Sequence, residues 1–256
     1  NTEKWSLIGA NVPVRQFGVA TTLGSGKLLL AAGEGRSTAD LWTTATGPIA
    51  TGSMSAMRSS MGWVHLDKGT ATEKVIIYGG ASNEGSPGSA LSTAEQYDPG
   101  TGTWSIRPGV MPYVKVSHTA TYLGDGTVLI AGGRETGWTN TALLHDLATD
   151  TYAALPNMPV NKAQHLAIAL STGNALVLGG TSGAYTSTNT TVLYNRATKT
   201  FALGPAMRYS RWEGTVVPYG AGKWLVLGGY GKIVGGPGGD VYLSTSEIYD
   251  EATNTW

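Results

Sequence analysis

The stretch from Ser117 to Tyr152 reads SHTATYLGDGTVLIAGGRETGWTNTALLHDLATDTY and decides the fold. It contains an apolar run that ends in Gly-Gly, then a polar loop, then a second short apolar run with an Asp-containing turn and a closing aromatic residue. Short apolar runs bounded by Gly- and Asp-rich turns are typical of β-strands. The stretch therefore predicts short strands joined by turns.

The same pattern occurs five times along the 256 residues. Gly-Gly, or Ala-Gly in the first repeat, follows an apolar run at 32–33, 79–80, 132–133, 179–180 and 228–229. The second runs close, 48 to 55 residues apart, at Ile49, Trp104, Tyr152, Phe201 and Trp256. A period near 50 residues with four short strands per unit is typical of a β-propeller.

We predict a single all-β domain over residues 1–256, a β-propeller of four-stranded antiparallel blades with five blade motifs. The motifs span about 10–55, 56–110, 111–157, 158–206 and 207–256. Residues 2–8 are similar to the strand that begins at Thr101, and we expect them to supply a fourth strand that closes a ring of five blades. The alternative is that the five motifs are part of a six- or seven-bladed propeller.

Two segments carry a resemblance to a known family. Glu95–Trp104 (EQYDPGTGTW) and Glu247–Trp256 (EIYDEATNTW), each preceded by Gly-Gly and a loop, resemble a kelch motif. The form is similar to that of bacterial and fungal kelch repeats, including those of the galactose-oxidase-like propellers. The resemblance implies a kelch propeller but not the copper site of galactose oxidase, because that site needs a Cys-crosslinked Tyr and this chain has no Cys.

Composition narrows the classes of partner. The formal net charge is zero, which argues against a nucleic-acid partner, and no apolar stretch is long enough for a membrane helix. His118 and His165 occupy equivalent repeat positions, but no third ligand accompanies them, so we predict no metal, no cofactor and no catalytic residue. Low charge and abundant Thr, Ser and Gly resemble secreted or cell-surface propellers, and we expect an extracellular or cell-surface location.

A basic residue precedes every first strand, and its type follows the residue that opens the third strand. Arg15, Arg58 and Arg211 occur with Asp40, Glu95 and Glu247, whereas Lys115 and Lys162 occur with Leu143 and Val192. This matching predicts a partly buried Arg–carboxylate pair in three repeats. The two lysines lack an acid at that position, and we expect them to be available to an anionic ligand.

Antiparallel strand order places the loops between second and third strands on one face of the propeller. These loops carry Trp138, Tyr185, Tyr230 and Tyr242, and the segments between blades add Tyr113, Tyr209 and Trp212. The predicted ligand-binding set contains the two lysines and five of these aromatics: Trp138, Tyr185, Tyr209, Trp212 and Tyr230. We predict a binding module that recognises a protein, peptide or glycan through this loop-rich face, rather than an enzyme. The alternative is a carbohydrate-active enzyme on the same scaffold.

Overall fold

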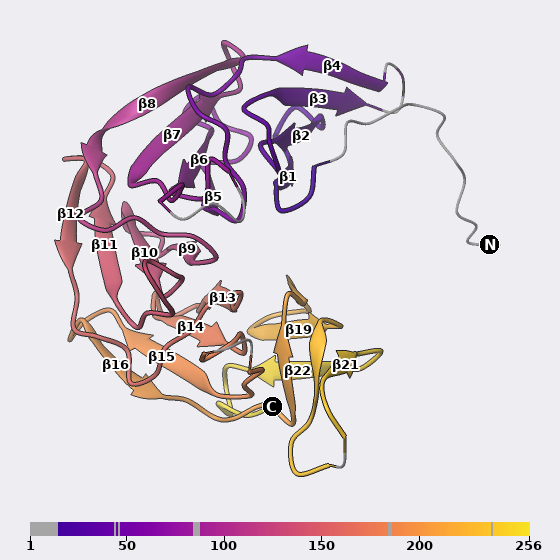
Figure 1. Ribbon diagram of the computed structural model, residues 1–256. Helices are drawn as coiled ribbons and strands as arrows, with labels where there is room; N and C mark the ends of the chain where they lie inside the picture. The colour runs from indigo at the N-terminus through magenta and orange to yellow at the C-terminus, as the bar shows by residue number, and fades with distance from the viewer. Residues whose placement is uncertain (1–14, 44, 46, 84–87, 184–185, 237) are drawn as a thin grey trace.

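The structure is a computed structural model that describes residues 15–43, 45, 47–83, 88–183, 186–236 and 238–256. Over these residues the chain forms 22 strands in six antiparallel sheets, and no helix occurs among them (Figure 1). The predicted all-β fold of four-stranded blades is confirmed.

Four of the sheets are blades whose four strands pair in sequence order. Blade 1 contains β1 (Val19–Thr22), β2 (Leu28–Ala31), β3 (Ala39–Thr43) and β4 (Gly47–Thr51). Blade 2 contains β5 (Gly62–Leu66), β6 (Lys74–Tyr78), β7 (Thr93–Asp98) and β8 (Thr103–Val110). Blade 3 contains β9 (Thr119–Tyr122), β10 (Thr127–Ala131), β11 (Ala142–Asp146) and β12 (Thr151–Ala154). Blade 4 contains β13 (Leu166–Ala169), β14 (Ala175–Leu178), β15 (Thr191–Asn195) and β16 (Thr200–Leu203).

The fifth repeat forms two three-stranded sheets. Blade 5 contains β18 (Thr215–Pro218), β19 (Lys223–Leu227) and β22 (Ser246–Asp250), paired in that order. A smaller sheet contains β17 (Tyr209–Trp212), β20 (Tyr230–Ile233) and β21 (Val241–Tyr242). The second sheet was not expected, because the sequence from Tyr230 to Ser246 reads as a loop.

The blades follow one another around a common centre (Figure 1). The first strands β1, β5, β9 and β13 lie nearest that centre, and the fourth strands β4, β8, β12 and β16 lie on the outside. The arc of described blades is open between blade 1 and blade 5. The number of blades therefore stays a prediction.

The predicted closing strand, residues 2–8, lies outside the described residues. Trp256 packs on Tyr249 with ring centroids 5.3 Å apart, as Trp104 packs on Tyr97 at 5.2 Å. Trp256 thus holds the place of the closing aromatic in blade 5.

A belt of backbone hydrogen bonds links the blades near the centre. One residue just before each first strand has a left-handed backbone with φ between 52° and 56°: Phe17, Ser60, Ser117, Gln164 and Glu213. The N–H of each of the last four donates to the carbonyl oxygen of the preceding member, at 2.7–3.2 Å. Residues other than Gly adopt this backbone only where their surroundings enforce it, so the belt fixes how successive blades meet.

The main cores lie between consecutive blades. Ile76 and Tyr78 of blade 2, for example, pack against Val128 and Ile130 of blade 3, and all four are fully buried. Blade 5 differs on the face turned away from blade 4, where Leu227 is exposed although its repeat equivalent, Leu178, is buried. The apolar strands thus bury their two faces against two neighbouring blades, which explains their unbroken apolar sequence.

Candidate binding face

The predicted Arg–carboxylate pairs are present in all three repeats. Arg15 contacts Asp40, and the guanidinium groups of Arg58 and Arg211 lie 3.0 Å from Glu95 and Glu247. Each pair joins the start of a blade to the start of its own third strand. The prediction that these arginines are structural is therefore confirmed.

The basic residue that precedes the first strand of each repeat also donates hydrogen bonds to backbone carbonyl groups at the loop end of its blade. The five residues are Arg15, Arg58, Lys115, Lys162 and Arg211. Arg58 donates to the carbonyl oxygens of Gly79 at 2.8 Å and Thr93 at 2.9 Å. The other four basic residues make the equivalent contacts to the residue before the second Gly and to a Thr two residues before the third-strand position. We call this arrangement the basic clamp. Burial lowers the pKa of Arg58, and the Glu95 carboxylate opposes that shift.

The clamps of blades 3 and 4 bury their lysines completely. The Lys115 ammonium group bonds Thr141 Oγ1 at 2.7 Å and lies 3.3 Å from Glu135, and burial lowers its pKa despite that carboxylate. The Lys162 ammonium group bonds the carbonyl oxygens of Gly179 and Thr190, and burial lowers its pKa to about 7. The expectation that these lysines are available to an anion is wrong for this conformation, because neither ammonium group reaches solvent.

A second feature of the clamps escaped the sequence comparison. The Glu95 carboxylate accepts the backbone N–H of Ser55 at 2.8 Å, and Glu247 accepts that of Arg208. The equivalent positions in the two lysine clamps are Pro112 and Pro159, which have no N–H to donate. Three positions therefore vary together between repeats: the basic residue, the residue three positions before the basic residue, and the residue that opens the third strand.

His118 and His165 fill the joints between successive blades. The His118 Nε2 atom accepts the Gly62 N–H at 3.3 Å, and the His165 Nε2 atom lies 2.9 Å from Thr119 Oγ1. Burial, reinforced by the charge of Lys115, lowers the pKa of His118 to about 3. Burial also lowers the pKa of His165 well below its usual value. In the described part of the chain, no three side chains of metal-binding type gather at one point.

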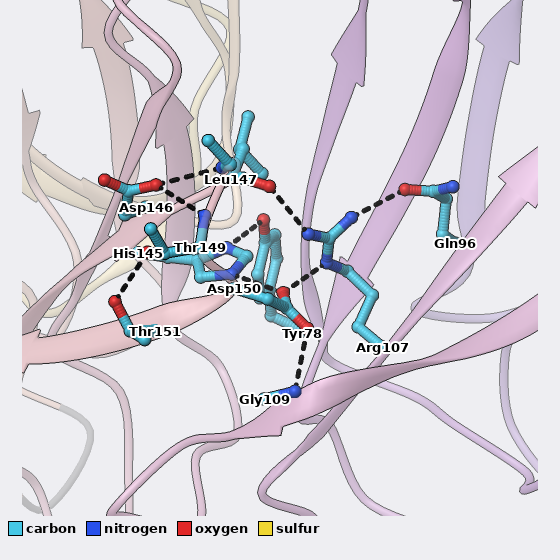
Figure 2. Close-up of polar contacts among 11 residues, drawn as sticks. Tyr78, Gln96, Arg107, Gly109, His145, Asp146, Leu147, Thr149, Asp150 and Thr151 are labelled. Carbon is cyan, nitrogen blue, oxygen red and sulfur yellow. Dashed lines mark hydrogen bonds and ion pairs between the residues drawn. The ribbon is translucent and has the colours of Figure 1, made fainter.

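Another histidine network joins blades 2 and 3 (Figure 2). His145 Nδ1 lies 3.0 Å from the Tyr78 hydroxyl, and its Nε2 lies 2.8 Å from Asp150 Oδ1. Asp150 also accepts the Arg107 Nε–H at 2.6 Å and the Gly109 N–H at 2.7 Å. Burial alone would raise the pKa of Asp150, but these hydrogen bonds outweigh it and lower the pKa. Since His145 and Tyr78 are fully buried, this chain of groups is a structural link between blades.

The clamps also bear on the alternative of a carbohydrate-active enzyme. The three acids that open third strands, Asp40, Glu95 and Glu247, all pair with arginines in the clamps. A glycosidase mechanism needs two carboxyl groups facing the substrate, one of them able to donate a proton. The clamp acids face buried guanidinium groups instead.

The loop-bearing face carries most of the predicted aromatic residues. Trp138 is half-buried, donates its Nε1–H to Thr181 Oγ1 at 2.9 Å and lies under the Arg134 guanidinium at 5.0 Å. It therefore packs the blade 3 loop against blade 4 while keeping part of its surface in solvent. Tyr185 lies outside the described residues.

Blade 5 brings two residues of the predicted set together with Tyr242, an aromatic residue of the same predicted loop. Trp212 stands opposite Tyr230, and Tyr230 stands opposite Tyr242, across β17, β20 and β21. Ring centroids are 5.6 and 5.1 Å apart, and both pairs meet edge to face. We call these three residues the aromatic ladder. Tyr242, at its free end, is 89% exposed.

Tyr209, the third member of the predicted set in this region, lies on the other side of the small sheet. It lines an open hollow of about 680 Å³ along β22, together with Glu247, Ile248 and Trp256. The Arg211 guanidinium lies 5.8 Å from the Tyr209 ring. This hollow occupies the position that β16 takes beside β15 in blade 4, so we attribute it to blade architecture.

Comparison with known proteins agrees with this architecture. Residues 69–111 match the family model of the Kelch motif, a range that includes β6, β7 and β8. Blades 1, 3 and 4 repeat the same strand order and the Gly-Gly or Ala-Gly positions, and this architecture fits a kelch-repeat β-propeller. A search of curated proteins finds no match to the chain. Among the described residues, no helix has the length and apolarity needed to cross a membrane.

Proposed function

We propose that this propeller is an interaction module that binds a partner protein on its loop-bearing face. The observation that carries the proposal is the exposure of apolar and aromatic side chains at one place on that face. Tyr242 and Val241 are 89% and 56% exposed, and they adjoin Tyr230 and Trp212. Exposed aromatic clusters with polar tips are frequent centres of protein interfaces.

The chemistry of the face supports binding more than catalysis. The clamp acids and the buried histidines serve contacts within and between blades. Kelch domains generally bind proteins, which supports a protein partner over the peptide and glycan alternatives. A glycan remains the second ligand class to test, since aromatic rings also stack on sugars.

The experiment compares two faces of the same molecule. Partners are captured from an extract, identified and purified, and their affinity is then measured against Trp138→Ala, Tyr242→Ala and Tyr219→Ala. Tyr219 is 55% exposed in the turn between β18 and β19, on the opposite face, and is the matched control. We expect at least one loop-face variant to weaken binding about tenfold or more. Equal binding by all variants, or binding of purified glycans alone, would refute the proposal.

We also propose an extracellular or cell-surface location, on the low charge and the abundance of Thr, Ser and Gly. The sequence contains one Asn-x-Thr acceptor site at Asn189, whose side-chain amide donates to the Met207 carbonyl oxygen at 2.7 Å. Fractionation of the producing cells tests the location directly.

A further inference from the structure

The small sheet of blade 5 is an extended form of a contact that occurs in earlier blades as isolated β-bridges between single residues. In blades 2, 3 and 4, the residue after Gly-Gly bridges one residue before the first strand and one in the following loop. The triplets are Ser59–Ala81–Ala90, Val116–Arg134–Trp138 and Ala163–Thr181–Ser187. In blade 5 the same three positions are those of the aromatic ladder, and the pairing extends to full strands.

The outer strand of this sheet has a free edge. β21 is the last strand in the order β17-β20-β21. The Leu243 N–H donates to the Gly229 carbonyl oxygen at 2.8 Å, so Leu243 and Val241 turn their backbone groups toward β20. By the alternation of an antiparallel pair, Tyr242 turns its N–H and C=O away from the sheet. β21 is only two residues long and contains neither a charged residue nor Pro, two of the features that protect an exposed edge.

A charge lies beside the exposed ring. Asp240 precedes β21 and, two residues before Tyr242, falls on the same side of an extended chain. Its carboxylate has no hydrogen bond or ion pair to any other part of the chain that the structure describes. A strand added beside β21 would meet the Tyr242 ring and, two residues along, this carboxylate.

We propose that the edge of β21 binds an extended segment of the partner, which adds to the small sheet as an antiparallel fourth strand. An aromatic residue of the segment stands opposite Tyr242 and exchanges both main-chain hydrogen bonds with it. A Lys or Arg two positions later stands opposite Asp240, because opposite charges across strands attract. This inference rests on the proposed function, since it states how the same face holds a protein.

The probe is a set of eight-residue synthetic peptides with a Thr-rich host and the central pattern Tyr-Thr-Lys. Controls replace the Tyr by Ala, replace the Lys by Glu, or methylate the backbone nitrogen of the Tyr. Methylation removes the main-chain donor while keeping the side chain. Binding is measured by titration calorimetry and by the fluorescence of the protein.

Three protein variants complete the design. Tyr242→Pro removes the outward N–H, which β20 does not use, and we expect it to weaken peptide binding at least tenfold. Asp240→Lys is expected to reverse the preference, so that the Tyr-Thr-Glu peptide binds better than the Tyr-Thr-Lys peptide. Tyr219→Ala is expected to bind like the parent. Circular dichroism and melting temperatures establish that each variant is folded.

The inference is overturned if no peptide binds at millimolar concentration, or if backbone methylation or Tyr242→Pro leaves binding unchanged. It is also overturned if sedimentation shows a dimer that Tyr242→Pro dissolves, because the edge then pairs with a second copy. The inference is overturned as well if a sugar, rather than a peptide, binds to the aromatic ladder. Should the purified partner lose affinity for Trp138→Ala but not for Tyr242→Pro, the interaction function stands and only the strand addition fails.

Discussion

Converting the blade 2 clamp into the lysine type tests whether the clamp acts as a unit. The change combines Arg58→Lys, Glu95→Leu and Ser55→Pro, which reproduces the residues of blade 3. In that blade, a lysine reaches the same two backbone carbonyl positions that Arg58 reaches at Gly79 and Thr93. We expect the triple variant to be within about 2 kcal/mol of the parent, because blades 3 and 4 already combine a clamp lysine with Pro and an apolar residue at these positions.

The costs expected for the three single replacements, in free energy of unfolding, add up to much more than the cost expected for the triple variant. Glu95→Leu leaves a fully buried guanidinium without its carboxylate and removes the acceptor of the Ser55 N–H, for about 3–5 kcal/mol. Arg58→Lys loses two charge-assisted bonds to Glu95, at 3.0 and 3.1 Å, for about 2–3 kcal/mol. Ser55→Pro removes two hydrogen bonds to Glu95, from the backbone N–H at 2.8 Å and from the hydroxyl at 2.9 Å, for about 2–3 kcal/mol. Independent effects would sum to about 7–11 kcal/mol.

The assay is urea unfolding followed by tryptophan fluorescence for the parent, the singles, the doubles and the triple. The slope with denaturant must stay constant across the set, so that midpoints report stability. A triple variant as unstable as the sum of the singles would refute the coupled clamp. A Glu95→Leu cost below about 1 kcal/mol would refute the role of the buried pair.

Three further outcomes follow from other contacts. Burial lowers the pKa of His118 and His165 in the folded state, so between about pH 6.5 and 5 only the unfolded chain binds protons at these histidines. Their contribution to stability is complete above about pH 6.5 and should fall by about 2 kcal/mol per histidine by about pH 5. Equal urea midpoints at about pH 7 and pH 5 would contradict this. Arg107→Ala breaks the link between blades 2 and 3 and should cost about 1–3 kcal/mol in urea unfolding, against less than about 1 kcal/mol for the exposed pair lost in Arg196→Ala; equal costs would argue against the link. If residues 2–8 line the edge of β22, deleting residues 1–9 should lower the melting temperature, and an unchanged value would speak against that closure.

The repeat architecture could be predicted from the sequence because its causes are local. Each Gly-Gly pair has a left-handed backbone at both glycines in four of the repeats, a requirement that the residue type itself reveals. The Arg–carboxylate pairs were predictable for a related reason. Five copies of one environment within a single chain act as an internal comparison, and the Arg and acid positions change together between copies.

The fate of the lysines could not be read from the same comparison. Lack of an acid suggested a free ammonium group, yet Lys162 is saturated by backbone and threonine oxygen atoms, which carry no signature in the sequence. Pro112 and Pro159 were the available signal. Because Pro has no N–H to donate, its presence at the position of Ser55 indicates that the clamp contains no carboxylate to accept such a bond. The lysine must then be satisfied by other acceptors.

The aromatic ladder depends on register, which sequence spacing leaves open. Trp212, Tyr230 and Tyr242 share a face only because the chain between Ile233 and Val241 reverses in one particular register. A shift of one residue would turn Tyr242 to the other face. Because earlier blades satisfy the same pairing with Ala, Ser or Thr at most of the equivalent positions, the propeller does not need aromatic residues there. Blade 3 has one aromatic residue at these positions, Trp138, whereas blade 5 has three, with the last ring in solvent. Three aromatic residues therefore point to a requirement outside the fold, and recognition of another molecule is a requirement that an exposed ring and an open strand edge can both meet.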